Sequence, residues 1–268
     1  MSAEIDESKE SFAAEFKELK QIIKNNKPLI HHITNNVTIN DCANITLNWG
    51  ALPVMAPAIE ESAQMVENAS ALVLNLGTIS SRQLESMLKS GRRANQLGIP
   101  IILDPVGVGA TEFRTKAAQK ILAELRIVLI KGNQGEISFL TGKTAGLKGV
   151  ESVGKYDKIA ESAKELAQKL GVVVVVSSET DLISDGSQIT KIEKGHHLMG
   201  KVVGTGCMLG STLGVFAAAA RETNLSLFKA AKTAVYYYSL AGEIAAAKEI
   251  KPAKFKIEFM DTIYSYVN

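Results

Sequence analysis

The feature that most constrains the fold of this chain is a regular alternation of short apolar runs with longer helical patterns. Six mostly apolar runs have the length of a β-strand: Leu29–Ile33, Pro53–Ala56, Ala71–Leu76, Ile99–Leu103, Ile127–Ile130 and Val172–Val176. Five segments with helical spacing lie between them: Thr38–Trp49, Glu60–Asn68, Ser80–Leu97, Thr115–Leu125 and Ile159–Leu170. Apolar strands that alternate with helices are typical of a parallel sheet covered on both faces. The alternation therefore predicts an α/β fold with a mainly parallel central sheet and helices on both faces.

The two ends of the chain extend this pattern. Apolar residues recur at helical spacing from Phe12 to Ile23 and predict a first helix over residues 8–25. After the sixth strand, Leu182–Ser184 and Gln188–Ile192 flank an Asp-Gly turn, which predicts a hairpin at the edge of the sheet. The rest of the chain is predicted to be helical over Leu209–Ala220, Leu225–Lys248 and Phe255–Tyr266.

No repeat or low-complexity linker divides the chain. The loosest segment, Gly142–Gly154, is interpreted as a loop and not as a domain boundary. We therefore expect residues 1–268 to form a single domain, with an amino-terminal helical segment over residues 1–27 packed on it.

Composition excludes several classes of partner. The 268 residues include 30 basic and 28 acidic side chains, and a net charge of +2 gives no general attraction to nucleic acid or to a membrane surface. The two cysteines, Cys42 and Cys207, are too few for a disulfide framework. The acidic amino terminus is unlike a signal peptide, and the apolar runs are too short to span a bilayer. A cytoplasmic protein is expected.

The sequence that carries most chemistry is Gly204-Thr205-Gly206-Cys207, at the start of a predicted helix. Glycines allow a close approach of the backbone to a ligand, and the first amides of a helix attract anions. A thiol in this position lies in the same positive field. The turn therefore predicts both an anion site and a reactive side chain.

Two further polar clusters follow predicted strands, where ligands bind in open α/β sheets. Asp104 precedes a glycine-rich loop and is interpreted either as a turn-initiating residue or as a contact to Mg²⁺ or its water shell. Lys131 could pair with a phosphate. Asn133 and Glu136 have the spacing of a capping box, and Glu136 could instead hold a cation.

The remaining clusters are more ambiguous. The segment from His31 to Thr38 could begin a helix, with Asn36 or Thr38 as its cap, or could form a polar rim around a small molecule. Its two histidines alternate along a strand, point to opposite faces, and are expected to be structural. Met55 could fill the core or form the apolar wall of a pocket. Ser177 and its neighbours offer hydroxyls to phosphates, although such residues are common in turns.

Together these strand-end clusters predict a site for phosphoryl transfer, which needs positioning, charge neutralisation and a group that takes the acceptor proton. Amides of Gly204–Gly206 would bind the transferring group, and Cys207 would act as general base or orient the acceptor hydroxyl. A role for Cys207 as covalent nucleophile lacks a supporting Cys-His-Asn pattern. Simple packing of a buried thiol is the other alternative.

From Leu29 to the carboxyl terminus the chain resembles the hydroxyethylthiazole kinases, a thiamine-salvage family of the ribokinase-like superfamily. The resemblance is carried by His32-Ile33-Thr34-Asn35, Asp104–Ala110, Lys131-Gly132-Asn133 with Glu136, and Gly204-Thr205-Gly206-Cys207. The cysteine is the most specific mark, since most ribokinase-like enzymes have an aspartate there. The resemblance implies transfer of phosphate from ATP, with Mg²⁺, to the primary hydroxyl of 4-methyl-5-(2-hydroxyethyl)thiazole.

The resemblance also implies roles for individual residues. It suggests Asn35, Val37, Met55 and Gly204 near the thiazole, Cys207 at its hydroxyl, Lys131, Ser177, Thr205 and Gly206 at the nucleotide, and Asp104 and Glu136 around Mg²⁺. It further implies a homotrimer with substrate sites between subunits. Lys131 departs from the family, which more often has arginine, and lysine lacks the bidentate fork of a guanidinium.

Overall fold

The computed structural model describes residues 9–142, 155–249 and 251–268, so nearly all of the loop expected over 142–154 lies outside the described residues. Within them, eight strands form one sheet in the order β2-β1-β3-β4-β5-β6-β7-β8. The strands are β1 Leu29–Ile33, β2 Leu52–Met55, β3 Ala71–Asn75, β4 Ile101–Asp104, β5 Leu129–Asn133, β6 Val173–Ser177, β7 Asp181–Ser184 and β8 Ile189–Ile192. The pairings of β1 to β6 are parallel, while those of β6 with β7 and β7 with β8 are antiparallel. The mainly parallel sheet and its edge hairpin are confirmed.

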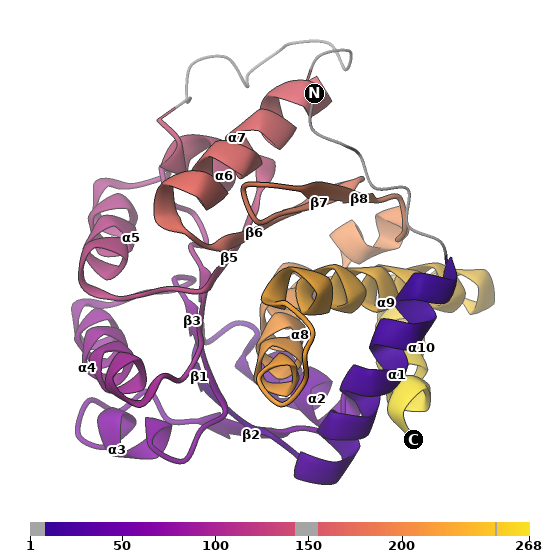
Figure 1. The fold of residues 1–268 in the computed structure, drawn as a ribbon, viewed down its shortest axis with the longest axis horizontal. Coiled ribbons are helices and arrows are strands. Elements are labelled where there is room, and N and C mark those ends of the chain that lie inside the picture. The colour runs from indigo at the N-terminus through magenta and orange to yellow at the C-terminus, as the bar shows by residue number, and fades with distance from the viewer. Residues whose placement is uncertain (1–8, 143–154, 250) are drawn as a thin grey trace.

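Helices cover both faces of this sheet (Figure 1). They are α1 Lys9–Asn26, α2 Ile39–Asn48, α3 Ser62–Val66, α4 Ser81–Leu97, α5 Glu112–Glu124, α6 Gln134–Leu140, α7 Lys155–Leu170, α8 Thr205–Ala220, α9 Leu227–Lys248 and α10 Pro252–Val267, with a 3₁₀ turn, η1, at His197–Lys201. In the described part of the chain, none of the helices is both long and apolar enough to cross a membrane.

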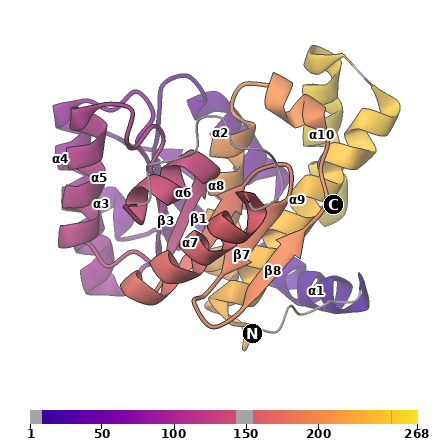
Figure 2. The ribbon, with the colours of Figure 1, turned by 90° about the horizontal axis from the view of Figure 1, so that it is seen from above.

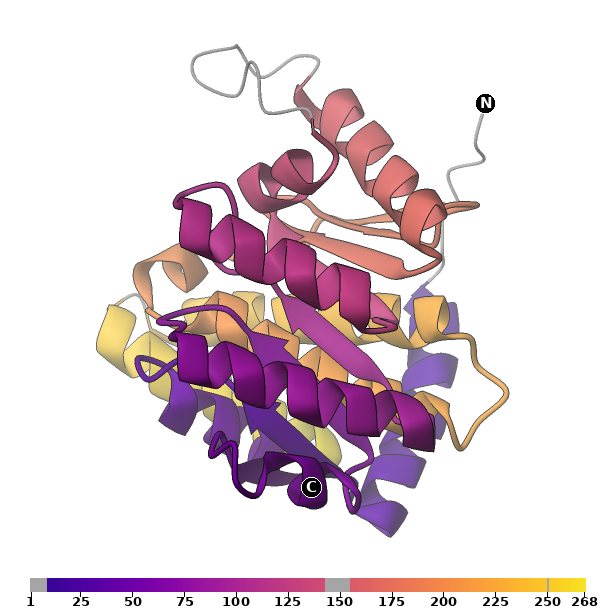
Figure 3. The ribbon, with the colours of Figure 1, turned by 90° about the vertical axis from the view of Figure 1, so that its left-hand side faces the viewer.

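The alternation of side chains along each strand divides the core into two layers. Val73 and Val175 face a cluster that includes α8 and α9, whereas Leu72 and Val174 face a cluster that includes α4 and α7. Figure 2 shows these layers from above, with α3, α4 and α5 on one side of the sheet and α1, α9 and α10 on the other. Figure 3 shows α4 and α5 lying across the face opposite α8. One sheet with two covered faces is the α/β architecture that the alternation predicts.

The first helix, predicted over residues 8–25, is α1 and packs on α8 and α9. A buried ion pair joins α1 to α9, and in it Lys232 Nζ lies 3.2 Å from Glu15 Oε1. Thr233 Oγ1 donates a hydrogen bond of 2.8 Å to the other oxygen of the same carboxylate. Burial of a charged group is tolerated when it is paired and hydrogen-bonded in this way. The extent of the domain over residues 1–268 stays a prediction.

Helix α8 lies unusually close to the sheet because small residues face the strands. A Cβ atom added at Gly214 would lie 2.6 Å from Val73 Cγ2, a separation that no real side chain tolerates. One and two turns earlier, the same face of α8 carries Gly210 and Gly206. The close approach brings the first turns of α8 against the carboxyl ends of β3, β4 and β5.

The strand boundaries differ from the sequence prediction by two residues or more in β4 and β5, and by one residue in β2, β3 and β6. β5 begins two residues later than expected and continues to Asn133, because Lys131, Gly132 and Asn133 pair in register with the end of β6. Lys131 therefore lies within a strand and not in a loop after it. β4 begins at Ile101, since the amide of Ile99 bonds to Ala94 O at the end of α4.

Candidate active site

A row of polar side chains runs along the carboxyl ends of four neighbouring strands, on the face that α8 covers. Each lies two residues after an apolar residue of the same face: His32 after Ile30, Asn75 after Val73, Asp104 after Ile102 and Lys131 after Leu129. Asn75 and Asp104 are register partners on β3 and β4. Because side chains alternate along a strand, this two-residue offset places all four on one face.

Asn75 is the member of this row that the sequence interpretation missed. It lies in a run that is otherwise apolar, Ala71–Leu76, whose pattern predicts only a buried strand. The offset from Val73 is the signal that could have found it, since the same offset recurs in the three other strands. The site is therefore better predicted from the faces of the strands than from the loops after them.

Cys207 lies in the first turn of α8, which begins at Thr205, four residues before the predicted start. Gly204 caps the helix in the left-handed region, with φ of 99°, and a Cβ there would lie 2.9 Å from Thr38 Cγ2. Cys207 is partly exposed, whereas Cys42 is buried and burial raises the pKa of its thiol to about 11. The accessible thiol is therefore the one at the helix N-terminus.

The sulfur of Cys207 accepts two hydrogen bonds from side-chain amides. Asn35 Nδ2 lies 3.3 Å and Asn75 Nδ2 lies 3.4 Å from Sγ. Asn35 also organises the start of α2, because its Oδ1 accepts from the amides of Val37 and Thr38 at 3.0 Å each. Thr38 occupies the N-cap position of α2, as one of the two sequence alternatives expects, but its side chain makes no capping bond. Asn35 Oδ1 instead fixes the turn that precedes the helix.

Asp104 and Lys131 form a buried ion pair, with Lys131 Nζ 3.4 Å from Asp104 Oδ1. Burial raises the pKa of Asp104 to about 6, against the opposing effect of Lys131. Burial alone would lower the pKa of Lys131, but the charges of Asp104 and Glu136 outweigh it and raise the value. The lysine therefore stays charged. A Cβ at Gly206 would lie 3.2 Å from Nζ, which places the ammonium beneath the first turn of α8.

Glu136 makes the capping box that its spacing allows. Asn133 Oδ1 accepts from the amide of Glu136 at 2.9 Å, and Glu136 Oε2 accepts from the amide of Asn133 at 2.8 Å. Its other oxygen accepts from the amide of Gly107 at 2.8 Å and so fixes the glycine-rich loop after β4. In the described part of the chain, no group of three or more histidine, cysteine or carboxylate side chains could hold a metal ion.

The two histidines of β1 are structural, as expected. His31 Nε2 lies 2.9 Å from Ala56 O on one face of the strand. On the other face, His32 lies between Ile30 O and Ser211 Oγ, at 3.0 and 3.1 Å. Burial lowers the pKa of His32 to about 3, so its ring is neutral near pH 7. Neither ring reaches the sulfur of Cys207 by a hydrogen bond.

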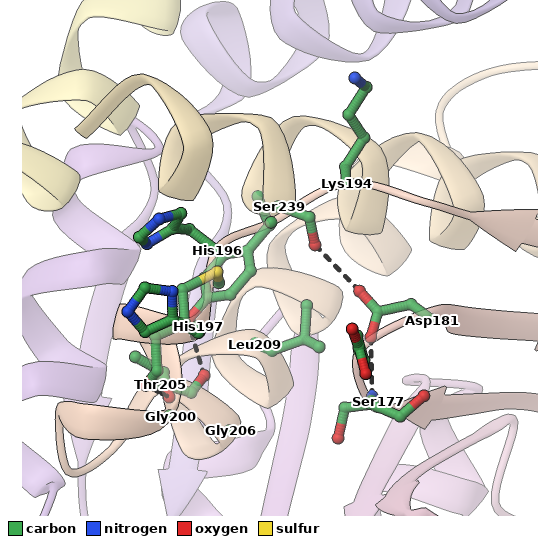
Figure 4. A pocket seen from close by; sticks show the side chains of 15 residues that line it. Ser177, Asp181, Lys194, His196, His197, Gly200, Thr205, Gly206, Leu209 and Ser239 are labelled. Atoms are coloured by element: carbon green, nitrogen blue, oxygen red, sulfur yellow. Dashed lines mark hydrogen bonds between the residues drawn. The ribbon is translucent and has the colours of Figure 1, made fainter. Parts of the chain in front are cut away.

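A cavity of about 710 Å³ opens beside the first turn of α8. Three residues predicted at the nucleotide, Ser177, Thr205 and Gly206, line it. In Figure 4, Ser177 and Asp181 lie on one side of the cavity, and His196 and His197 lie on the other. Thr205 Oγ1 donates to Met199 O at 2.9 Å, so its hydroxyl hydrogen serves the fold and not a ligand.

The other predicted substrate residues lie around the same end of the sheet. Val37 is 64 % exposed and is tied to Asn35 through its backbone amide. Met55 is the last residue of the edge strand β2, is partly buried, and is the register partner of His32. Gly204 directly precedes the helix that carries the thiol, and a Cβ atom there would lie 2.9 Å from Thr38 Cγ2.

Residues 19–268 match the Hydroxyethylthiazole kinase family. A hydroxyethylthiazole kinase from Thermoanaerobacter sp. (strain X514) is 50 % identical over 254 residues, which cover 93 % of this chain and 94 % of the relative. The solved structure of a hydroxyethylthiazole kinase protein from Pyrococcus horikoshii OT3 has a TM-score of 0.85 at 36 % identity and covers 94 % of this chain and 93 % of its own.

The fold extends to more distant proteins. A ribokinase-like superfamily protein from Enterococcus faecalis V583 has a TM-score of 0.66 at 16 % identity, with 94 % of both chains covered. At this identity the likeness concerns the fold alone, which is ribokinase-like. The match over residues 19–268 and the high identity over almost the whole length decide the family. This chain belongs to the hydroxyethylthiazole kinase family.

Proposed function

We propose that this chain transfers the γ-phosphoryl group of ATP to the primary hydroxyl of 4-methyl-5-(2-hydroxyethyl)thiazole. Membership of the family and the names of its relatives support the reaction and the substrate. The observation that carries the assignment to residues is the position of Cys207, held by two amides at the N-terminus of α8, between a buried ion pair and a large cavity. The product is the thiazole phosphate that thiamine salvage uses.

The cavity beside α8 is assigned to ATP. Its volume of about 710 Å³ suits a small-molecule cosubstrate. The amides of Thr205 and Gly206 lie at a helix N-terminus, where the peptide dipoles favour phosphate. Lys131 adds a positive charge beneath the same turn, and Ser177 contributes a hydroxyl at the cavity wall. These groups neutralise charge that develops on the transferring phosphoryl group.

The thiazole alcohol is assigned to the opposite side of Cys207, among Asn35, Val37, Met55 and Gly204. Cys207 is the general base. As the hydroxyl oxygen bonds to the γ-phosphorus, the hydroxyl proton passes to Sγ. The bond from the γ-phosphorus to its bridging oxygen breaks, and ADP leaves with that electron pair. Asn35, which the amides of Val37 and Thr38 orient, holds the sulfur from the side of β1.

Mg²⁺ is assigned to Asp104 and Glu136, held through its water shell. Carboxylate oxygens are its preferred protein ligands, and Mg²⁺ usually keeps several waters. Both oxygens of Glu136 already accept backbone amides, and Asp104 Oδ2 accepts from Asn75, which leaves each oxygen one further lone pair for a water. When bound, the ion neutralises charge on the phosphates of ATP.

A homotrimer with substrate sites between subunits is part of the proposal, as is a cytoplasmic location. Val37 and Val203 are 64 % and 69 % exposed. They lie on the two segments that meet where Gly204 contacts Thr38. A second copy of the chain covering these valines would close the thiazole side of the site.

The proposed cytoplasmic location agrees with the state of the cysteines. Both are free thiols, which suits a reducing compartment.

The experiment that tests the function measures ADP release by the purified chain with ATP and Mg²⁺, with and without hydroxyethylthiazole. We expect release that depends on the thiazole, and much less with pyridoxal or a pyrimidine alcohol. Folded protein that releases no ADP in response to the thiazole at saturating ATP would refute the assignment.

The oligomeric state is tested separately. Light scattering should give the mass of three chains, and Val203→Glu should reduce the measured mass.

A further inference from the structure

Two buried amides, one from β3 and one from the segment after β1, converge on the sulfur of Cys207. Asn75 and Asn35 are only 2 % and 3 % exposed. Each directs its Nδ2 atom at Sγ, over 3.4 and 3.3 Å. They also bond to each other, since Asn35 Nδ2 donates to Asn75 Oδ1 at 3.0 Å. The amides therefore form a connected pair and not two separate contacts.

The orientation of both amides follows from what their oxygens accept. Asn35 Oδ1 accepts from the backbone amides of Val37 and Thr38. Asn75 Oδ1 accepts from the amide of Gly77 at 2.9 Å, in addition to Asn35. A flipped side chain would set an NH₂ group against these N–H donors, so the network assigns each nitrogen to the sulfur side. N–H groups, and not oxygens, face Cys207.

The second hydrogen of the Asn75 amide is also used. Asn75 Nδ2 donates to Asp104 Oδ2 over 2.7 Å, the shorter of its two bonds. One nitrogen thus joins the thiol to the carboxylate that is paired with Lys131. Gly77 makes room for the arrangement, because a Cβ there would lie 2.8 Å from Asn35 Cβ and 2.9 Å from Asn75 Oδ1.

We propose that Asn75 is a positioning residue for Cys207. Its amide bridges Sγ and Asp104 and, with Asn35, occupies the sides of the sulfur that face β1 and β3. The remaining side of the sulfur is left to accept the hydroxyl hydrogen of the phosphoryl acceptor. This inference rests on the proposed role of Cys207 as base. Asn75 itself gives up no proton, and its role is exerted through the sulfur.

The first test is a double-mutant cycle on kcat with Asn75→Ala and Cys207→Ala. General bases contribute about 10²- to 10⁴-fold, and we expect loss of their positioning to cost part of that, on the order of tenfold in kcat for Asn75→Ala. In the Cys207→Ala background the same change should cost less than about twofold, because residues that act as a unit are non-additive. The KM for ATP should change by less than about twofold, since the substitution removes no group assigned to the binding of ATP.

An equal loss in both backgrounds would overturn the inference, because Asn75 would then act through Asp104 or the fold. Two further variants separate these causes. In the Cys207→Asp background an acceptor is restored, and the loss caused by Asn75→Ala should return. Asn48→Ala removes another side-chain amide, which donates to Met260 O on a different part of the molecule, and should leave kcat close to that of the parent.

The second test does not depend on activity. The side-chain ¹H–¹⁵N signals of Asn35 and Asn75 should shift in Cys207→Ala, since each loses a sulfur acceptor. Those of Asn48, which donates to Met260 O at 3.0 Å on another part of the molecule, should not. Unshifted signals of Asn75 would overturn the bridge. If the chain released no ADP with the thiazole, the proposed function would fail, and these spectra would still decide whether Asn75 holds the sulfur.

Discussion

Asp104 and Lys131 lie side by side on the neighbouring strands β4 and β5, where solvent reaches 0 % of one residue and 4 % of the other. An ion pair in such a place depends on both members, because removal of one leaves a buried charge without compensation. A change to either member should therefore destabilise the fold and disrupt the site together.

Asp104→Asn should lower the free energy of unfolding by about 3–5 kcal/mol, the usual cost of breaking a buried pair from one side. The double change Asp104→Asn with Lys131→Met should recover most of this loss in urea denaturation, but not the activity. Glu60→Gln, which removes an exposed partner of Arg82, is the matched control and should leave the urea midpoint almost unchanged. A double variant as unstable as Asp104→Asn would contradict this account.

Cys207→Ala should lower kcat by about 10²-fold or more, since it removes the group that takes the hydroxyl proton. Cys207→Asp should retain or exceed the parent activity, because a carboxylate supplies a resident negative charge for the same role. Both are measured as thiazole-dependent ADP release, with thermal unfolding as the check on folding. Full activity of Cys207→Ala would show that the base lies elsewhere.

Gly214→Ala should destabilise the fold by about 1–3 kcal/mol, the range found for overpacked cores. The added methyl group would meet Val73 Cγ2 at 2.6 Å and push α8 away from the sheet. Gly200→Ala is a suitable control, because nothing lies within 4 Å of a Cβ at that position. Equal melting temperatures of the two variants would contradict the close packing of α8.

Asp181 should make stability depend on pH. Burial raises its pKa from 3.8 to about 6, so the folded protein holds this proton more tightly than the unfolded chain does. Its contribution is complete below about pH 3.8 and is lost as the pH rises through 6. Asp181→Asn lacks the ionisation, and should gain stability relative to the parent between pH 4 and 7, by up to about 3 kcal/mol. A difference that stays constant over this range in urea denaturation would refute the assignment.

The sequence predicts the strands well because their apolar runs are long enough to be buried on both faces. The ends of the strands are less predictable. Lys131 looks like a loop residue when β5 is judged alone, and becomes a buried strand residue only because β6 continues the pairing beside it. Each of Lys131, Gly132 and Asn133 pairs with a residue 44 positions further along the chain, so no local pattern carries this information.

The candidate site was predictable in its parts but not in its connections. Glu136 has the spacing of a capping box, and the structure contains one. The sequence places Asn35 beside a ligand, yet its oxygen fixes the turn before α2 while its nitrogen faces Cys207. An asparagine side chain carries both an acceptor and a donor, and the residue type alone does not show which partner each one binds. Asn75 escaped notice because one amide in an apolar run resembles a chance substitution until the neighbouring strands are aligned.

The burial of α8 has a practical consequence for measurement. From Met208 to Ala220 every residue of this helix is buried, and its first turn carries the candidate site. A ligand that engages this turn therefore contacts the element that the rest of the core depends on, and the turn cannot open without weakening that core. Binding at such a place raises the free energy of global unfolding by an amount set by ligand concentration and affinity. For this protein, the melting temperature recorded against increasing ligand is a direct titration of site occupancy.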